Sequence, residues 1–237
     1  MTAADFDWAS VAHELDAAGC AVVRAVLNGD ECRAYAGAYD APDAPDAPER
    51  YRSRVVMERH GFGRGEYQYF AYPLPQPLEA MRSALYGPLA AIANRWHEAM
   101  GEAARFPAAH ADFIARCHAN GQLRPTPLIL QYRAGDYNCL HQDLYGEHVF
   151  PLQVALLLSR PGIDFTGGQF VLTEQRPRMQ SRVEVVELAH GDCVIFPVKH
   201  RPVTGVKGVY RVAMRHGVSR VKSGQRHTLG IIFHDAD

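Results

Sequence analysis

The chain has 237 residues, of which 47% are hydrophobic and 22% are charged. These proportions are ordinary for a soluble globular protein, and the length allows one sizeable domain whose core needs no disulfide or structural metal to fold. The formal net charge of -1 excludes the global basic field that marks many nucleic-acid-binding proteins. Locally, residues 193–234 contain lysines and arginines but no Asp or Glu, which indicates either a basic face balanced elsewhere or an anion-binding surface.

The cysteines are scattered along the chain, are odd in number and form no CxxC pair. This spacing argues against a disulfide framework or a zinc knuckle and favours a reducing compartment. The N-terminus shows no signal-peptide pattern, and no apolar run approaches the roughly 20 residues that a membrane helix needs. We therefore expect a cytoplasmic protein without a membrane segment, and its oligomeric state stays open.

Residues 1–124 are expected to form a helical N-terminal support. Asp7 can cap a helix whose apolar positions recur at helical spacing, and Gly19 is expected to end this helix. Residues 20–27 predict a buried strand, and residues 30–39 predict a second helix. The Pro/Asp repeat APDAPDAPER that follows cannot continue a helix and is interpreted as an exposed, mobile connection.

Residues 51–72 interleave arginines with aromatic residues around three glycines. Aromatic faces and guanidinium groups suit a surface that stacks bases and follows a phosphate backbone, so Arg64, Tyr67 and Tyr69 are candidate substrate-binding residues. The alternative is that these aromatic side chains simply pack on the core. Together with the preceding Pro/Asp repeat, this stretch gives a mobile 41–72 segment that could act as a lid over a site.

The sequence pattern changes from helical to strand-like at about Arg124. Before it, helices broken by Pro88 and Pro107 are expected. After it, short segments rich in Val, Ile, Leu, Phe and Tyr alternate with turn signals, and roughly eight such strands predict a closed antiparallel fold for which a jelly roll is the natural candidate. Helices followed by strands make the class α+β. We expect residues 125–237 to form the jelly-roll core, in one integrated domain with the helical support.

His141 and Asp143 lie at the end of the predicted strand CLHQD. Residues i and i+2 of a strand face the same side, so both side chains can address one point inside a barrel. An imidazole and a carboxylate are two of the three ligands of the facial triad that holds non-haem Fe(II) and leaves positions open. An HxD motif is too common to carry this prediction alone, so its sequence context has to support it.

That context comes from both sides of the motif. Tyr132 ends a predicted strand upstream, and the run from His216 to Arg226 introduces the last strand. Residues 127–235 resemble the Fe(II)/2-oxoglutarate-dependent dioxygenase superfamily, with features of its AlkB-like and prolyl-hydroxylase-like members. In that superfamily an HxD motif is followed by a distal His and then by an Arg or Lys, and His216 and Arg226 match this order.

The resemblance implies a double-stranded β-helix, or jelly-roll, fold and an oxidoreductase that uses Fe(II), 2-oxoglutarate and O₂. It further implies that His141, Asp143 and His216 bind the metal. Arg226 would pair with the far carboxylate of 2-oxoglutarate through its two-pronged guanidinium, and Tyr132 could donate its hydroxyl to the same carboxylate.

The stretches GEHVFPLQ, RPRMQSR, MRHGVSR and HTLGIIFHD resemble, more narrowly, a small bacterial oxygenase family proposed to act on damaged nucleic acid. This implies hydroxylation of an unactivated C–H bond, with oxidative demethylation of damaged nucleic acid, and hence DNA repair, as one outcome. The same chemistry on a protein side chain, an amino acid or a small metabolite is a second hypothesis, which the near-zero net charge favours. A non-catalytic metal-binding jelly-roll module is a third.

A second histidine competes for the role of distal metal ligand. His200 directly follows the predicted strand at residues 193–196, and Arg211 would then be the co-substrate Arg. We favour His216, because the Gly-Gln-Arg sequence ending at Arg226 completes the superfamily pattern. Otherwise His200 and Arg211 line the pocket or lie on the surface, and Asn138, in the turn before the HxD motif, could reach the co-substrate.

Overall fold

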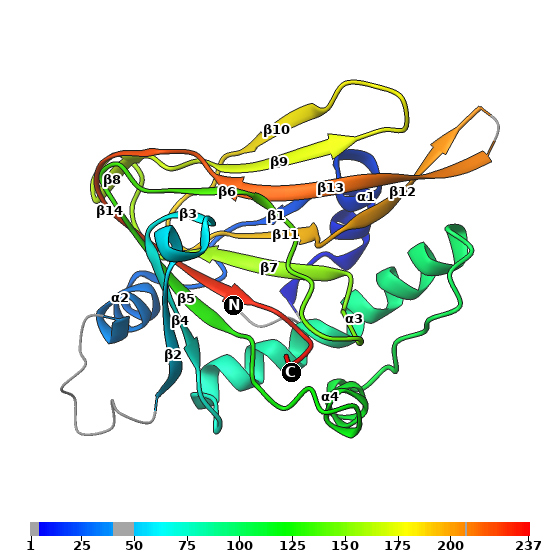
Figure 1. Cartoon of the computed structure of the whole chain (residues 1–237), viewed down its shortest axis with the longest axis horizontal. Coiled ribbons are helices and arrows are strands. Elements are labelled where there is room, and N and C mark those ends of the chain that lie inside the picture. The colour runs from blue at the N-terminus through cyan, green and yellow to red at the C-terminus, as the bar shows by residue number, and fades with distance from the viewer. Residues whose placement is uncertain (1–4, 40–49, 207) are drawn as a thin grey trace.

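The computed structural model describes residues 5–39, 50–206 and 208–237. Its strands form two antiparallel sheets, and α3 and α4 lie on the side of the larger sheet that faces away from the smaller one (Figure 1). The helical elements are α1 (Trp8–Ala18), α2 (Gly29–Tyr39), the 3₁₀ helix η2 (Met57–His60), α3 (Gln76–Ala99) and α4 (His110–Ala119).

The larger sheet has eight strands. In order across the sheet these are β1 (Ala21–Val23), β11 (Cys193–Pro197), β7 (Leu152–Leu157), β14 (Val221–Ile231), β5 (Leu128–Arg133), β4 (Glu66–Phe70) and β2 (Tyr51–Val56), with β8 (Phe165–Gly167) paired to β14. The central strand β7 is buried along its whole length, because the second sheet covers one face and the helices cover the other.

The smaller sheet has six strands. Its order is β10 (Arg182–Val186), β9 (Phe170–Gln175), β13 (Gly208–Val218), β6 (Tyr137–His141) and β3 (Gly63–Arg64), with β12 (His200–Gly205) paired to β13. The long strands β13 and β14 follow each other in the chain but belong to different sheets. The chain therefore folds over from one sheet to the other, as it does in a jelly roll.

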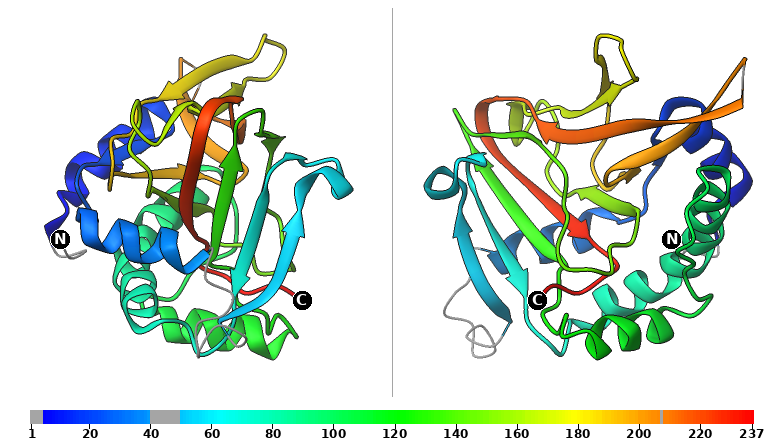
Figure 2. Two further views of the ribbon diagram at one scale, coloured as in Figure 1. Left: turned by 90° about the vertical axis from the view of Figure 1, so that its left-hand side faces the viewer. Right: turned by 45° about the vertical axis from the view of Figure 1, so that its right-hand side comes forward.

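The main hydrophobic core lies between the larger sheet and the helices. Figure 2 shows α3 and α4 side by side beneath this sheet. The aromatic rings of Tyr86 on α3, Phe113 on α4, Phe150 and Phe233 are buried and pack against one another in this layer. The layer holds the larger sheet in place, so that its other face can form one wall of a site.

The structure agrees with the predicted cap of the first helix but not with the predicted break at Pro88. The cap of α1 is confirmed, since the Asp7 carboxylate accepts a hydrogen bond from the Ser10 amide at 3.1 Å and Gly19 adopts φ 81° after the last turn. The prediction that Pro88 breaks a helix is wrong, because α3 runs through it without interruption. Leu85 and Leu89, on either side of the proline, are buried, and this packing stabilises the helix despite the missing N–H group.

Most of residues 51–70 form three short strands, interrupted by the 3₁₀ helix η2, rather than an irregular connection. The sequence EYQYF of β4 alternates, so that Tyr67 and Tyr69 are buried while Glu66 and Gln68 are partly exposed. β4 pairs with β2 on one side and with β5 on the other, so this part of the predicted 41–72 segment belongs to the larger sheet. Residues 40–49 lie outside the described residues.

The sheets also cross the predicted boundary at residue 124. β1 pairs with β11, and β4 pairs with β5, so strands from the N-terminal half are built into the larger sheet. The strand predicted at residues 20–27 is shorter than expected and covers Ala21–Val23. Within the described residues no helix combines the length and apolar character needed to cross a bilayer.

Candidate metal centre

A cavity of about 390 Å³ opens between the two sheets. His141, Asp143 and His216 are in its wall, and so are Tyr132 and Arg226. The wall also contains Phe62, Tyr67, Asn138, Tyr145, Gln153, Thr228 and Ile232. The residues predicted to bind metal and co-substrate are therefore gathered around one cavity.

The two histidines are brought together by the register of β6 and β13. His141, the last residue of β6, pairs directly with His216 on β13, and their ring centroids are 4.2 Å apart. Gly217 lets the strands approach this closely, because a Cβ atom there would lie 2.7 Å from the carbonyl oxygen of Asn138. β6 ends at His141, so Asp143 reaches the same point from the following loop and not from the strand that was predicted.

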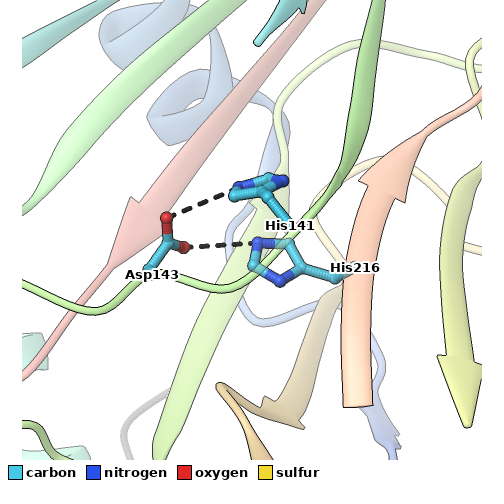
Figure 3. A group of neighbouring side chains, drawn as sticks. All are labelled: His141, Asp143 and His216. Carbon is cyan, nitrogen blue, oxygen red and sulfur yellow. Dashed lines mark ion pairs between the residues drawn. The ribbon is translucent and has the colours of Figure 1, made fainter. Parts of the chain in front are cut away.

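Asp143 faces both imidazoles, with one carboxylate oxygen directed toward each ring (Figure 3). Its Oδ1 is 3.4 Å from Nε2 of His141, and its Oδ2 is 3.3 Å from Nε2 of His216. One ligand atom from each of the three residues lies within 4.8 Å of the other two. Two imidazole nitrogens and a carboxylate oxygen at this spacing fit a divalent transition metal such as Fe(II) and leave further positions on it open.

The two imidazoles are held in different ways. Nδ1 of His141 donates a hydrogen bond to the carbonyl oxygen of Cys139 at 2.8 Å, which leaves the lone pair of Nε2 free to bind metal. Nδ1 of His216 is buried and has no hydrogen-bond partner among the described residues. The ring of His216 packs on Phe196 and Phe170, at centroid distances of 4.7 and 6.0 Å, so this packing and the contacts of Nε2 set its orientation.

Electrostatics favour an ionised carboxylate at the centre of the cluster. Burial raises the pKa of Asp143, but hydrogen bonds to His141 and His216 outweigh this effect and hold it well below its ordinary value. Burial lowers the pKa of His216. At His141 burial also lowers the pKa, but the hydrogen bond to Asp143, the charge of Asp143 and backbone hydrogen bonds together outweigh it and raise the pKa. The metal-free cluster thus holds a buried anion that a bound cation would neutralise.

Two side chains that the sequence reasoning missed hold the carboxylate of Asp143. The Tyr145 hydroxyl donates to Oδ1 at 2.9 Å, and the Gln153 amide donates to Oδ2 at 3.0 Å. Gln153 also lies 3.5 Å from Nε2 of His216. The only signal in the sequence is that Gln153 is a polar residue inside an otherwise apolar strand, and a buried polar group needs a partner.

Arg226 and Tyr132 lie at another part of the same cavity wall. The Arg226 side chain is buried and makes a hydrogen bond to the Thr228 hydroxyl, but its Nε has no partner among the described residues. The Tyr132 ring lies 5.7 Å from the guanidinium, and the Asn138 amide donates to the Tyr132 hydroxyl at 3.3 Å. A buried guanidinium without a carboxylate partner in the described chain suits a ligand that brings its own carboxylate.

The alternative distal ligand, His200, does not join this cluster. It begins β12, opposite Ala213, and is neither in the metal-binding group nor in the cavity wall. Arg211 pairs with Glu102 at 2.9 Å and is likewise absent from the wall. Among the described histidines, the structure therefore brings His216 to His141 and Asp143.

The three candidate substrate-binding residues occupy different places. Tyr67 is in the cavity wall. Arg64 is exposed on β3, with its Nε 3.6 Å from a carboxylate oxygen of Glu58. Tyr69 is buried outside the wall, and the guanidinium of Arg52 lies 4.2 Å from its ring centroid.

Comparison with known proteins finds one family that covers most of the chain. Residues 65–236 match the family Oxygenase-NA, described as an oxygenase catalysing oxidative methylation of damaged DNA. Two uncharacterised proteins, from two strains of Mycobacterium tuberculosis, are each 47% identical over 167 residues, which is 70% of this chain and 72% of theirs.

Solved structures with low sequence identity share the fold. One is an oxidoreductase of the 2OG-Fe(II) oxygenase family from Burkholderia pseudomallei, with 14% identity, a TM-score of 0.55 and coverage of 98% of this chain and 94% of that one. Another is the non-heme alpha-ketoglutarate-dependent carbocyclase SnoK from nogalamycin biosynthesis, with 12% identity, a TM-score of 0.52 and coverage of 98% and 86%. These matches confirm the predicted α+β class with a double-stranded β-helix.

Proposed function

Because this chain belongs to the Oxygenase-NA family, we propose that it hydroxylates a C–H bond on a damaged base of DNA, with His141, Asp143 and His216 as its metal ligands. The family confirms that the protein is an oxygenase and thus an oxidoreductase. The shared fold and the His-Asp-His cluster support dependence on Fe(II) and 2-oxoglutarate. The DNA substrate and the roles of individual residues are the proposal.

One observation carries the residue roles. A three-ligand metal cluster and a buried guanidinium without a carboxylate partner face the same cavity of the described chain. Arg226 would bind the far carboxylate of 2-oxoglutarate, and Tyr132 would donate its hydroxyl to that carboxylate. Bound iron, with 2-oxoglutarate and O₂, supplies the oxidising power for an unactivated C–H bond, while the protein orients the reactants and excludes water.

The rest of the cavity wall favours an uncharged substrate group. In the described wall the charged or readily charged side chains are His141, Asp143, His216 and Arg226, which metal and co-substrate would occupy. The remaining surface is provided by apolar, aromatic and neutral amide groups. A free amino acid would find no partners there for its ammonium and carboxylate groups, whereas a neutral planar base would be accommodated.

The mouth of the cavity supports a nucleic-acid substrate. Phe62, which is 48% exposed, lines the mouth, and the His60 ring stacks on it at 5.3 Å. Arg59 and Arg64 flank these rings in the chain and are exposed. Aromatic rings beside cations suit stacked bases and their phosphates. We propose Phe62, Arg64 and Tyr67 as substrate contacts.

The first experiment tests the metal and co-substrate. Anaerobic addition of Fe(II) and 2-oxoglutarate should produce the weak visible absorption band of iron chelated by a 2-oxoacid. We expect the band in the parent and in His200→Ala and its loss in His216→Ala. A band that survives in His216→Ala but not in His200→Ala would reverse the ligand assignment, and no band in a folded parent would refute the proposed roles.

The second experiment tests the substrate. Succinate release is measured with single-stranded DNA carrying methylated bases, with unmodified DNA, with peptides and with free amino acids. We expect stimulation by methylated DNA, and weaker DNA binding in Phe62→Ala and Arg64→Gln with full metal affinity. Stimulation by peptides or amino acids alone would show that the substrate is a protein side chain or an amino acid and not DNA.

A further inference from the structure

Two side chains that the proposed reaction does not use meet the carboxylate of Asp143 from opposite directions. Tyr145 donates to Oδ1, the oxygen that faces His141, and Gln153 donates to Oδ2, the oxygen that faces His216. Each carboxylate oxygen therefore has one neutral protein donor and one imidazole neighbour. A carboxylate held at both oxygens cannot turn about its Cβ–Cγ bond without breaking a hydrogen bond to a charged group.

Gln153 is placed where folding alone gives no reason for an amide. It lies on β7 with its side chain 3% exposed, and the other residues of this strand are apolar and buried. Burying an amide is unfavourable unless it finds hydrogen-bond partners, and here the partners are Asp143 and His216. An apolar residue of similar size would pack equally well in this strand, so the amide points to a role at the metal ligand.

Tyr145 has a second tyrosine as a neighbour. Its side chain lies close to Tyr69, whose ring lies edge-on to Tyr67 at 5.3 Å and under the guanidinium of Arg52. Tyr69 is buried outside the cavity wall, near a tyrosine that contacts Asp143, and not in the wall where a substrate contact was expected. The donors to Asp143 thus come from the loop after β6 and from β7, which belong to opposite sides of the cavity.

We propose that Tyr145 and Gln153 are positioning residues that hold Asp143 as a ligand through a single oxygen. The inference rests on the proposed function, in which Asp143 binds the metal. A carboxylate free to turn could chelate with both oxygens and take up one more position on the metal. Donors on both oxygens oppose this rearrangement and keep that position available for the reactants.

The test measures metal binding and does not depend on turnover. Co(II) is titrated anaerobically into the metal-free full-length protein and into Tyr145→Phe and Gln153→Met, and its visible spectrum gives both affinity and coordination. We expect Co(II) affinity to fall about tenfold in each variant, with a changed spectrum, because loss of an outer partner of a ligand typically has an effect of this size.

Tyr86→Phe is the matched control, since it removes a buried hydroxyl that has no partner among the described residues and lies outside the cavity wall. Unchanged affinity and spectrum in folded Tyr145→Phe would overturn the proposal, and so would an equal loss in Tyr86→Phe. Tyr145 is only partly buried, so Tyr145→Phe keeps the test decisive if Gln153→Met does not fold. Co(II) binding that is unaffected by Asp143→Ala would instead refute the proposed metal site itself.

Discussion

The Arg226 guanidinium lies in the cavity wall with 1% of the residue exposed. Burial lowers its pKa to about 10, so it stays protonated at neutral pH. A buried cation without an anionic partner in the described chain is unfavourable for folding. This arrangement makes sense if the partner is the carboxylate of a ligand, which would offset the desolvation of the charge when it binds.

Replacing Arg226 should therefore affect co-substrate binding and spare the metal. Hydrogen bonds to a charged group contribute about 1.5–3 kcal/mol, so Arg226→Gln should raise the Kd of 2-oxoglutarate by roughly 10–150-fold. The Kd is measured by titrating 2-oxoglutarate into protein loaded with metal. Arg211→Gln, which removes only a surface ion pair with Glu102, should leave this Kd unchanged. A fall in metal affinity in Arg226→Gln would contradict the assigned role.

The resemblance to a known superfamily, and not spacing alone, predicted which residues would meet at the candidate site. His141, Asp143, His216 and Arg226 follow a recurring order of residue types, and the structure brings all four to one cavity. The donors Tyr145 and Gln153 have no such pattern, because their role depends on how a loop and a strand of the other sheet pack. The same reason hid the position of Tyr69, whose neighbours become visible only in three dimensions.

At the scale of elements, α3 contains a proline that is unfavourable inside a helix. Pro88 lies inside the helix and lacks the N–H group that would complete the hydrogen-bond ladder. Since proline is about 3 kcal/mol less favourable than alanine inside a helix, Pro88→Ala should raise the free energy of unfolding by roughly 1–3 kcal/mol, measured in urea. Pro77→Ala, in the first turn where proline is tolerated, is the control and should change it little. A loss of stability in Pro88→Ala would show that the proline shapes the packing of α3.

The stability of the fold should depend on pH through His110 on α4. Its Nε2 lies 2.9 Å from the carbonyl oxygen of Phe233, and burial lowers its pKa from 6.5 to about 4. Folding therefore favours the neutral form, so this contribution to stability is complete above pH 6.5 and is lost as the pH falls toward 4.

Thermal unfolding between pH 7 and pH 5 tests this dependence. One such histidine changes the free energy of unfolding by at most about 1.4 kcal/mol per pH unit, so the Tm of the parent should fall more steeply than that of His110→Gln. Equal slopes in the two proteins would show that His110 is not the group responsible.

Some strands could be predicted from the sequence pattern and others could not. Segments with alternating or continuous apolar residues, such as those of β5, β7 and β14, could be recognised because burial dictates their composition. β12 carries Pro202 and lacks such a pattern, and it forms a strand because the neighbouring β13 provides a complete partner. The residues of β2 and β4, rich in arginine and aromatic side chains, were also consistent with a loop, and the pairing of β4 with both β2 and β5 shows that they are strands.

At the scale of the whole molecule, a buried ion pair joins the helical layer to the C-terminal segment. Arg82 on α3 donates to Asp235 at 2.8 Å and to the carbonyl oxygens of Ile232 and His234, and both charged side chains are fully buried. Asp235 also accepts a hydrogen bond from Tyr72 at 2.9 Å. The end of the chain is thereby fastened to the helix that supports the larger sheet.

Breaking this pair should destabilise the whole fold. Arg82→Met removes the arginine charge beside buried Asp235 and leaves it with Tyr72 and His118 as partners, so we expect the free energy of unfolding to fall by about 3–5 kcal/mol. Urea unfolding measures the effect. Arg95→Met removes an exposed ion pair with Asp16 and should lower stability by less than about 1 kcal/mol. A similar loss in the two variants would mean that the buried pair has no special role.

The direct pairing of His141 with His216 also has a consequence for how the protein folds. The two strands that carry them are far apart in the chain, so the pair forms only after a long loop has closed. A slip of one residue between β6 and β13 would turn His216 to the opposite face of its strand. During refolding, metal should therefore bind only after this loop has closed. The fraction of chains that bind metal would then equal the fraction that has reached the native strand register.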